Sequence, residues 1–158
     1  MDNINALFFD IDGTLVSFKT HQIPRSTVEA IAKAKENGVG IYISTGRPLQ
    51  IITNLKDIEP YIDGYITTNG ALCFVGSNVV CCNPIPKKNV DFLLSDADRY
   101  DYAVLVVGES GVRLYNKKPV FDEVFVKGLN VTNIDTTLSV VDLSLIHISE
   151  PTRRSYIS

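Results

Sequence analysis

The chain has 158 residues, of which 45% are hydrophobic and 21% charged, and its formal net charge is −3. This length suits one modest domain, or one domain and part of another. The small negative charge argues against nucleic acid or an acidic membrane surface as a partner, because both attract basic proteins. The sequence contains no long apolar span and no signal-peptide pattern, which predicts a cytoplasmic protein.

Strands and helices alternate over the first 70 residues. Three short apolar runs, each closed by polar residues or glycine, predict buried strands at 5–10, 39–43 and 62–67. Two segments that open on a proline predict helices at 24–37 and at about 48–57. This alternation is typical of a parallel sheet with crossover helices, and it predicts the α/β class.

The pattern changes after residue 70 and predicts a separate α+β unit. Paired apolar runs around short polar turns predict two hairpins, one at 72–75 and 79–82 and the other at 103–107 and 112–115. Residues 87–99 favour a helix, whereas residues 122–127 fit a helix or a strand equally well. We expect the boundary between the two units near Asn83 and Pro84.

The three cysteines are Cys73, Cys81 and Cys82. An odd count with an adjacent pair fits neither a disulfide framework nor the spacing of a zinc site. We therefore expect reduced thiols that are mostly buried.

Two aspartates lie at the end of the first predicted strand: Asp10 is its last residue, and Asp12 follows just before Gly13. In a strand, residues i and i+2 project to the same side, about 6.5–7 Å apart. At the carboxyl end of a parallel strand both would face the crevice in which open α/β sheets bind ligands. Gly13 permits a tight turn there. The alternative is a charged strand end that is simply exposed to water.

Three motifs in this order resemble the haloacid dehalogenase-like superfamily of phosphatases. They are residues 10–15 (DIDGTL), 44–48 (STGRP) and 68–71 (TNGA), and each closes a predicted strand. Within the superfamily they are similar to the Cof-type branch (subclass IIB), which carries a large inserted cap. The resemblance is specific over residues 5–71. It implies a Rossmann-like catalytic core, present in part over residues 1–83, and the start of an α+β cap over residues 84–142.

The resemblance also implies roles for individual residues. Asp10 would be the nucleophile that becomes an aspartyl-phosphate, and Asp12 would protonate the leaving alcohol and later activate water. Mg²⁺ would be held by the Asp10 carboxylate and the Asp12 main-chain carbonyl. The implied phosphate- and substrate-binding residues are Ile11, Thr45, Gly46, Arg47 and Asn69.

Alternatives stay open for three of these positions. Ser44 could supply the hydroxyl in place of Thr45. Arg47 could hold the substrate phosphate or pair on a helix surface. Asn69 could serve only the Asn-Gly turn, which is a common structural signal.

Two further motifs of the superfamily are missing from the chain. One is a lysine that steadies the aspartyl-phosphate, and Lys117, Lys118 and Lys127 lie too early for it. The other is a G-D-x-x-N-D-like segment that completes the Mg²⁺ shell, whereas the only acid after Asp142 is Glu150. We therefore expect the 158-residue chain to be inactive by itself.

The C-terminal residues 143–158 raise a separate question. Residues 143–153 (LSLIHISEPTR) resemble the in-frame translation of a transposase adapter used in short-read library preparation. The alternative is a natural tail of unknown function. We expect an adapter-derived tail, so that the natural sequence would stop near Asp142, inside the cap.

Two classes of function follow from the sequence. The first is a Mg²⁺-dependent phosphatase of small phosphorylated metabolites, with sugar phosphates as the expected substrates, and a sugar-phosphate mutase is a related alternative. The second is a non-catalytic remnant that binds phosphate or metal. In both cases the expected partner is a small phosphorylated metabolite, with no nucleic acid and no membrane.

Overall fold

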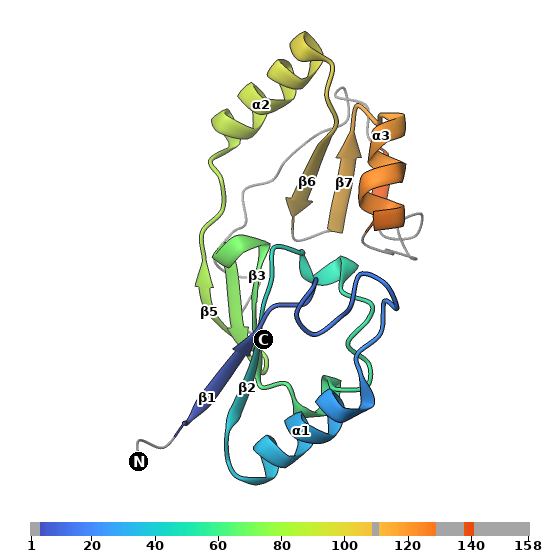
Figure 1. The fold of residues 1–158 in the computed structure, drawn as a ribbon. Coiled ribbons are helices and arrows are strands. Elements are labelled where there is room, and N and C mark those ends of the chain that lie inside the picture. Colours follow the sequence, from blue (N-terminus) through green and yellow to red (C-terminus); the bar gives the residue numbers. More distant parts are fainter. Residues whose placement is uncertain (1–3, 109–110, 129–137, 141–158) are drawn as a thin grey trace. The chain divides into compact units, whose positions relative to one another are not determined.

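The computed structural model describes residues 4–108, 111–128 and 138–140. Contacts within the chain divide it into two compact units, residues 1–83 and 84–158 (Figure 1). The predicted tail, residues 143–158, lies outside the described residues.

The first unit is built on a five-stranded sheet. Its strands are β1 (Ala6–Phe9), β2 (Gly40–Ser44), β3 (Gly64–Thr67), β4 (Leu72–Val75) and β5 (Asn78–Cys82), paired in the order β1-β2-β3-β4-β5. The first three strands are parallel, and the β4–β5 hairpin adds two antiparallel strands to the same sheet. The three predicted strands and the first hairpin are therefore confirmed.

One helix, α1 (Arg25–Glu36), contributes to the core beside the sheet. Its Ile31 is buried in one cluster with Ile41 and Ile43 of β2, and Val28 and Ala34 pack against that cluster. Because these apolar positions share one helix face, the period of the sequence predicted the helix correctly.

The helix predicted at 48–57 is wrong. The chain forms only a short 3₁₀ turn, Leu49–Ile51, and Ile52 then turns extended with φ −87° and ψ 105°. Ile51, Leu55 and Ile58 are nevertheless buried. A series of turns therefore buries residues at the i, i+4, i+7 spacing that is typical of a helix. β-branched residues disfavour helix slightly, and the Arg47 side chain binds the Ile51 carbonyl at 3.3 Å, which helps hold the turn in this form.

β1 is less buried than its apolar sequence predicts. Among the described residues it pairs with β2 alone, and Phe8 is 60% exposed. Phe8 stacks on Tyr42 of β2 with ring centroids 5.0 Å apart. Leu7 and Phe9 point to the other face and pack against the core. The strand therefore has one covered face and one open face.

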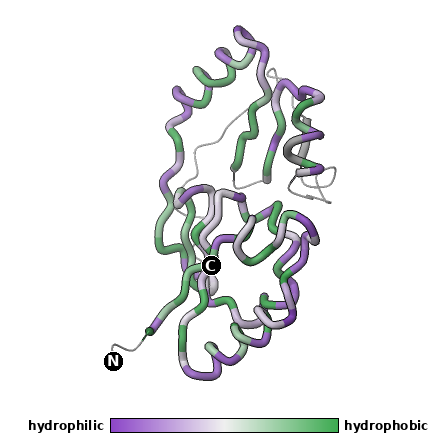
Figure 2. The backbone as a smooth tube through the Cα atoms, viewed as in Figure 1, coloured by the Kyte–Doolittle hydropathy of each residue, from purple (hydrophilic) through white to green (hydrophobic). Residues whose placement is uncertain are grey.

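The second unit places α2 (Lys87–Tyr100) beside a three-stranded sheet of β6 (Val104–Gly108), β7 (Gly111–Tyr115) and β8 (Leu138–Val140). Leu94 and Ala97 of α2 pack with Tyr115, and α2 alternates hydrophobic and hydrophilic residues along its length (Figure 2). The open choice at 122–127 resolves as helix, because α3 (Pro119–Phe121) continues into a π-helical segment, Asp122–Lys127.

The cysteines are free, and the expectation of burial fails for one of them. Cys73 and Cys81 lie opposite each other in β4 and β5 and are partly buried, whereas Cys82 is exposed. Burial raises the pKa of the Cys73 thiol.

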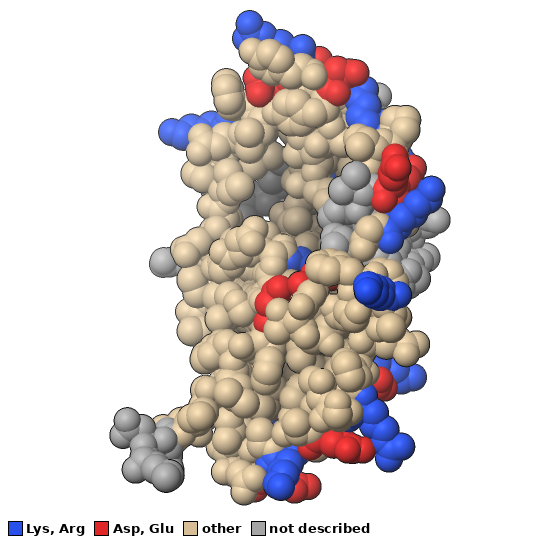
Figure 3. Space-filling view, viewed as in Figure 1, with Lys and Arg blue, Asp and Glu red and all other residues tan. Residues whose placement is uncertain are grey.

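Acidic and basic side chains are interspersed within each unit on the face drawn in Figure 3. In the described part of the chain, every helix is too short or too polar to cross a bilayer.

Candidate active site

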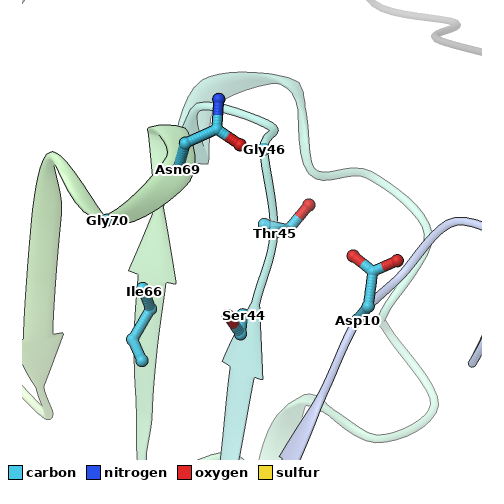
Figure 4. Close-up of a pocket in the computed structure, with 7 residues that line it drawn as sticks. All are labelled: Asp10, Ser44, Thr45, Gly46, Ile66, Asn69 and Gly70. Carbon is cyan, nitrogen blue, oxygen red and sulfur yellow. The ribbon is translucent and has the colours of Figure 1, made fainter.

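An open pocket of about 410 Å³ lies at the carboxyl ends of the parallel strands (Figure 4). Asp10 follows β1, Ser44 closes β2, and Ile66 belongs to β3. The pocket is lined by these residues together with Thr45, Gly46, Asn69 and Gly70. The parallel pairing of β1, β2 and β3 thus brings together four predicted site residues from three separate motifs: Asp10, Thr45, Gly46 and Asn69.

Asp10 is exposed, and its carboxylate points into the same space as the Thr45 hydroxyl (Figure 4). The turn after it is closed by main-chain hydrogen bonds of 2.9 Å, from Gly13 to Val16 and from Val16 to Ile11. Gly13 has φ +81°, a left-handed conformation that suits glycine. Ile11 is fully buried, so its main chain alone is available for the phosphate contact that the resemblance implies.

Thr45 holds its side chain in a defined direction. Its Oγ1 accepts a hydrogen bond from the Arg47 amide at 3.1 Å, and its own amide donates to the Ile66 carbonyl at 2.9 Å. Because a hydroxyl can accept and donate at once, the Thr45 O–H remains a donor for a phosphoryl oxygen. Ser44 also lines the pocket, so both hydroxyls stay candidates.

Asn69 lies in a strained turn beside the end of β2. Thr68, Asn69 and Gly70 have φ of 52°, 55° and 88°, three consecutive left-handed residues. A β-branched residue such as Thr68 rarely adopts this conformation, and such strain concentrates at functional sites. The Asn69 Oδ1 lies 3.0 Å from the point where a Cβ on Gly46 would stand, so the amide sits directly over the Gly46 backbone.

Arg47 and Asp12 form an ion pair that the sequence analysis did not anticipate. Arg47 Nη2 lies 2.6 Å from Asp12 Oδ1, and Arg47 Nε lies 2.8 Å from Asp12 Oδ2. The Arg47 side chain is only 4% exposed, and the Asp12 side chain is 23% exposed. The available signal was their placement at the ends of neighbouring parallel strands.

The oxygen ligands present fit part of a Mg²⁺ shell. Mg²⁺ prefers oxygen donors and is often bound through one or two carboxylates plus substrate phosphates. The exposed Asp10 carboxylate and the Asp12 carbonyl belong to this class, whereas the Asp12 carboxylate is engaged by Arg47. Within residues 4–108, 111–128 and 138–140, no group of three or more metal-ligating side chains comes together.

A model of the haloacid dehalogenase-like hydrolase family matches residues 7–153 of the chain. The chain belongs to this family. The match reaches into residues 143–153, which lie outside the described residues, so the adapter origin of that stretch stays a prediction.

Solved structures of the haloacid dehalogenase-like superfamily support the same assignment. One comes from work on a trigonal-bipyramidal intermediate in a phosphoryl-transfer superfamily. It is 39% identical with a TM-score of 0.81, over 87% of this chain and 53% of that chain. Another is the subclass IIB sugar phosphatase BT4131, which is 40% identical with a TM-score of 0.78, over 86% of this chain and 52% of that chain. The predicted Cof-type, Rossmann-like α/β fold is thereby confirmed.

A relative in Bacillus subtilis (strain 168) is described as "Putative phosphatase YkrA". It is 29% identical over 107 residues, which is 68% of this chain and 41% of YkrA. The chain spans about half the length of the haloacid dehalogenase-like hydrolases that it matches.

Proposed function

We propose that these residues belong to a Mg²⁺-dependent phosphatase of small phosphorylated metabolites, and that sugar phosphates are its substrates. The observation that carries the proposal is the pocket in which the Asp10 carboxylate, the Thr45 hydroxyl and the Asn69 amide meet at the strand ends. A nucleophile and hydrogen-bond donors around one open space are what phosphoryl transfer requires.

Each of these groups has a defined task in the proposed reaction. An Asp10 carboxylate oxygen attacks phosphorus, the bond from phosphorus to the alcohol oxygen breaks, and Asp12 gives that oxygen its proton. Asp12 then takes a proton from the water that releases phosphate from Asp10. Thr45 and the Gly46 amide donate to the phosphoryl oxygens, and Asn69 lines the entrance on the side of β3.

Mg²⁺, held by the Asp10 carboxylate and the Asp12 carbonyl, would neutralise charge on the phosphoryl group. The charge matters because a carboxylate is a weak nucleophile towards a dianionic phosphate. The positions of the Asp10 carboxylate and of the hydrogen-bond donors then set the direction of attack on phosphorus.

One comparison favours a sugar phosphate over other monoesters. BT4131 is described as a sugar phosphatase and matches most of this chain at 40% identity. The sparse and mixed surface charge also suits a small soluble substrate better than nucleic acid or a membrane. We also propose that the protein works in the cytoplasm. A sugar-phosphate mutase and, for the 158-residue chain alone, a non-catalytic remnant remain the alternatives.

Substitution of the two aspartates tests the proposed function. In the longest protein that the gene encodes, Asp10→Asn should abolish hydrolysis of sugar phosphates in the presence of Mg²⁺. Asp12→Asn should slow it by about 10²–10⁴-fold, which is the usual contribution of general acid–base catalysis. The measurement is release of inorganic phosphate with each purified variant.

The 158-residue chain, assayed alongside, should release no phosphate. Turnover by Asp10→Asn would contradict the assignment of the nucleophile. Turnover by the short chain that Asp10→Asn removes would show that the missing motifs are dispensable.

A further inference from the structure

The guanidinium of Arg47 donates hydrogen bonds to both oxygens of the Asp12 carboxylate. The two contacts, 2.6 Å to Oδ1 and 2.8 Å to Oδ2, are the side-by-side geometry that arginine forms with a carboxylate. A bidentate pair fixes the plane of the carboxylate as well as its position, which a lysine at the same place would not do.

Arg47 is itself held in place by its surroundings. Its Nη1 donates to the Ile51 carbonyl at 3.3 Å, and its amide donates to the Thr45 hydroxyl at 3.1 Å. Its carbonyl accepts from the Thr68 amide at 3.2 Å. The Arg47 side chain is also only 4% exposed. These contacts and this burial hold Arg47 in place, so that it can fix the orientation of the Asp12 side chain.

These contacts separate Arg47 from the phosphate-binding role that the resemblance implies. Arg47 is not among the residues that line the pocket with Asp10, Thr45 and Asn69. The guanidinium commits two of its nitrogens to a carboxylate, and a phosphate would have to displace that carboxylate. A purely stabilising ion pair is also a weak explanation, because burying charge costs about as much as the pairing returns.

We infer that Arg47 is the positioning residue for Asp12: it fixes the plane of the Asp12 carboxyl group, and when Asp12 carries the proton that the leaving alcohol takes, one Asp12 oxygen keeps its contact with Arg47 while the other holds that proton. The inference rests on the proposed function, because it concerns the proton donor of that reaction. Arg47 acts through Asp12 and has no direct contact with the reacting phosphorus.

The test compares two substrates that differ in their need for a proton. An alkyl phosphate such as a sugar phosphate must have its leaving oxygen protonated, whereas p-nitrophenyl phosphate releases a phenolate that needs little help. The measured quantity is kcat/KM, which covers the steps up to release of the leaving group and leaves out the later hydrolysis of the Asp10 ester.

For Arg47→Gln in the longest encoded protein, kcat/KM for the sugar phosphate should fall by about 10²–10⁴-fold, as for Asp12→Asn. For p-nitrophenyl phosphate it should fall less than about tenfold. Arg47→Lys should show the same substrate pattern with a smaller loss. Arg47→Gln should cost nothing further in an Asp12→Asn background, because residues that act as one unit are non-additive.

Arg25→Gln is the matched control, since Arg25 forms an exposed ion pair with Glu29 on α1. It should leave kcat/KM for both substrates unchanged. Equal losses on both substrates that add to those of Asp12→Asn would overturn the inference in favour of a phosphate ligand. Unchanged kinetics in a folded Arg47→Gln protein would overturn it in favour of a structural pair.

Failure of the proposed function looks different from failure of this inference. The former shows as activity that survives Asp10→Asn, whatever residue stands at position 47. The latter shows within an enzyme that depends on Asp10, as the wrong ratio between two substrates. If Arg47→Gln does not fold, the same ratio measured for Arg47→Lys decides.

Discussion

Two residues just after β2, Thr45 and Arg47, point their side chains in different directions and have different roles. Thr45 faces the pocket, whereas Arg47, two residues later, turns inward to Asp12. The Arg47 amide also donates to Thr45 Oγ1, so the fold that orients the arginine orients the hydroxyl as well. The orientations of the Thr45 and Arg47 side chains are therefore coupled, and the two residues do not act as independent groups.

Replacement of the Thr45 hydroxyl should weaken phosphate binding, and it also removes the acceptor of the Arg47 amide, so the stability of the variant is measured alongside. Thr45→Val keeps the shape and removes one donor to a charged group, which is worth about 1.5–3 kcal/mol. We therefore expect kcat/KM to fall by about 10- to 100-fold in phosphate-release assays. Ser44→Ala is the control and should change it little. The reverse order of effects would assign the hydroxyl to Ser44.

Asp63 is a residue whose charge supports the sheet. Its Oδ2 accepts the Ile41 amide of β2 at 2.8 Å, and Oδ1 is paired with Lys35 of α1. The hydrogen bond from Lys35, followed by that from Ile41, lowers the pKa of the Asp63 carboxyl below its ordinary value of 3.8. A carboxyl with a lower pKa in the folded state stabilises the fold above its unfolded pKa, and this contribution disappears as the pH falls through the folded pKa.

Asp63→Asn should therefore reduce the free energy of unfolding by about 1 kcal/mol at pH 7, since both partners are partly exposed. The difference from wild type should shrink as the pH falls below about 4. Urea unfolding at a series of pH values measures it. Asp57→Asn, at an exposed position of the same unit, is the control. A difference that persists at the acid end would contradict the charge-based explanation.

Helices and strands could be predicted from the sequence where the spacing of apolar residues agrees with the way the segment packs in the fold. The period of α1 and the apolar runs of β1, β2 and β3 gave their places correctly. The segment 48–57 has helical spacing at Ile51, Leu55 and Ile58, yet a series of turns buries the same side chains. The spacing of apolar residues predicts which residues are buried. It does not determine whether a helix or a series of turns buries them.

The site was predictable to the same extent. The family resemblance of the strand-end motifs implied that Asp10, Thr45 and Asn69 share one site, and the parallel strands do bring these residues to one pocket. The Arg47–Asp12 pair was not predictable, because side-chain direction beyond a strand end depends on turns that a single sequence does not specify.

Gly64 shows how closely two elements approach each other. A Cβ at this position would collide with the Phe74 carbonyl oxygen and lie 3.1 Å from Val75 Cα, both on the backbone of β4. Gly64→Ala should thus push β3 and β4 apart and lower the free energy of unfolding by about 2 kcal/mol. The measurement is chemical denaturation followed by circular dichroism.

Gly108→Ala is the matched control, because a Cβ on this strand residue would meet its nearest neighbour, the Gly111 carbonyl, at 3.9 Å. It should change stability by a few tenths of a kcal/mol. Equal effects of the two substitutions would mean that β3 and β4 adjust freely and that the close approach has no role.

At the scale of the whole chain, the first unit has an open sheet edge. β1 pairs with β2 alone in the part of the chain that the structure describes, and its Phe8 and the adjoining Tyr42 form a stacked apolar surface. Unpaired strand edges with apolar faces promote aggregation. We expect the 158-residue chain to self-associate through this edge.

Phe8→Lys should shift the chain towards the monomer, because a lysine on an edge strand opposes pairing with another strand. Sedimentation velocity over a range of concentrations measures the change. Phe92→Lys is the control: Phe92 is 66% exposed, close to the 60% of Phe8, but it lies on α2. A concentration-independent monomer for the unmodified chain would contradict the expectation.

The Arg47–Asp12 pair has a consequence for what can approach Asp10. A phosphate monoester carries close to two negative charges near neutral pH, and each uncompensated carboxylate about 5 Å away would repel each of those charges by about 3 kcal/mol at an effective dielectric of 20. While Asp12 is ionised, the guanidinium 2.6 Å away cancels its formal charge. An arriving dianion therefore meets the repulsion of one aspartate in place of two, although Asp10 and Asp12 stand only two residues apart.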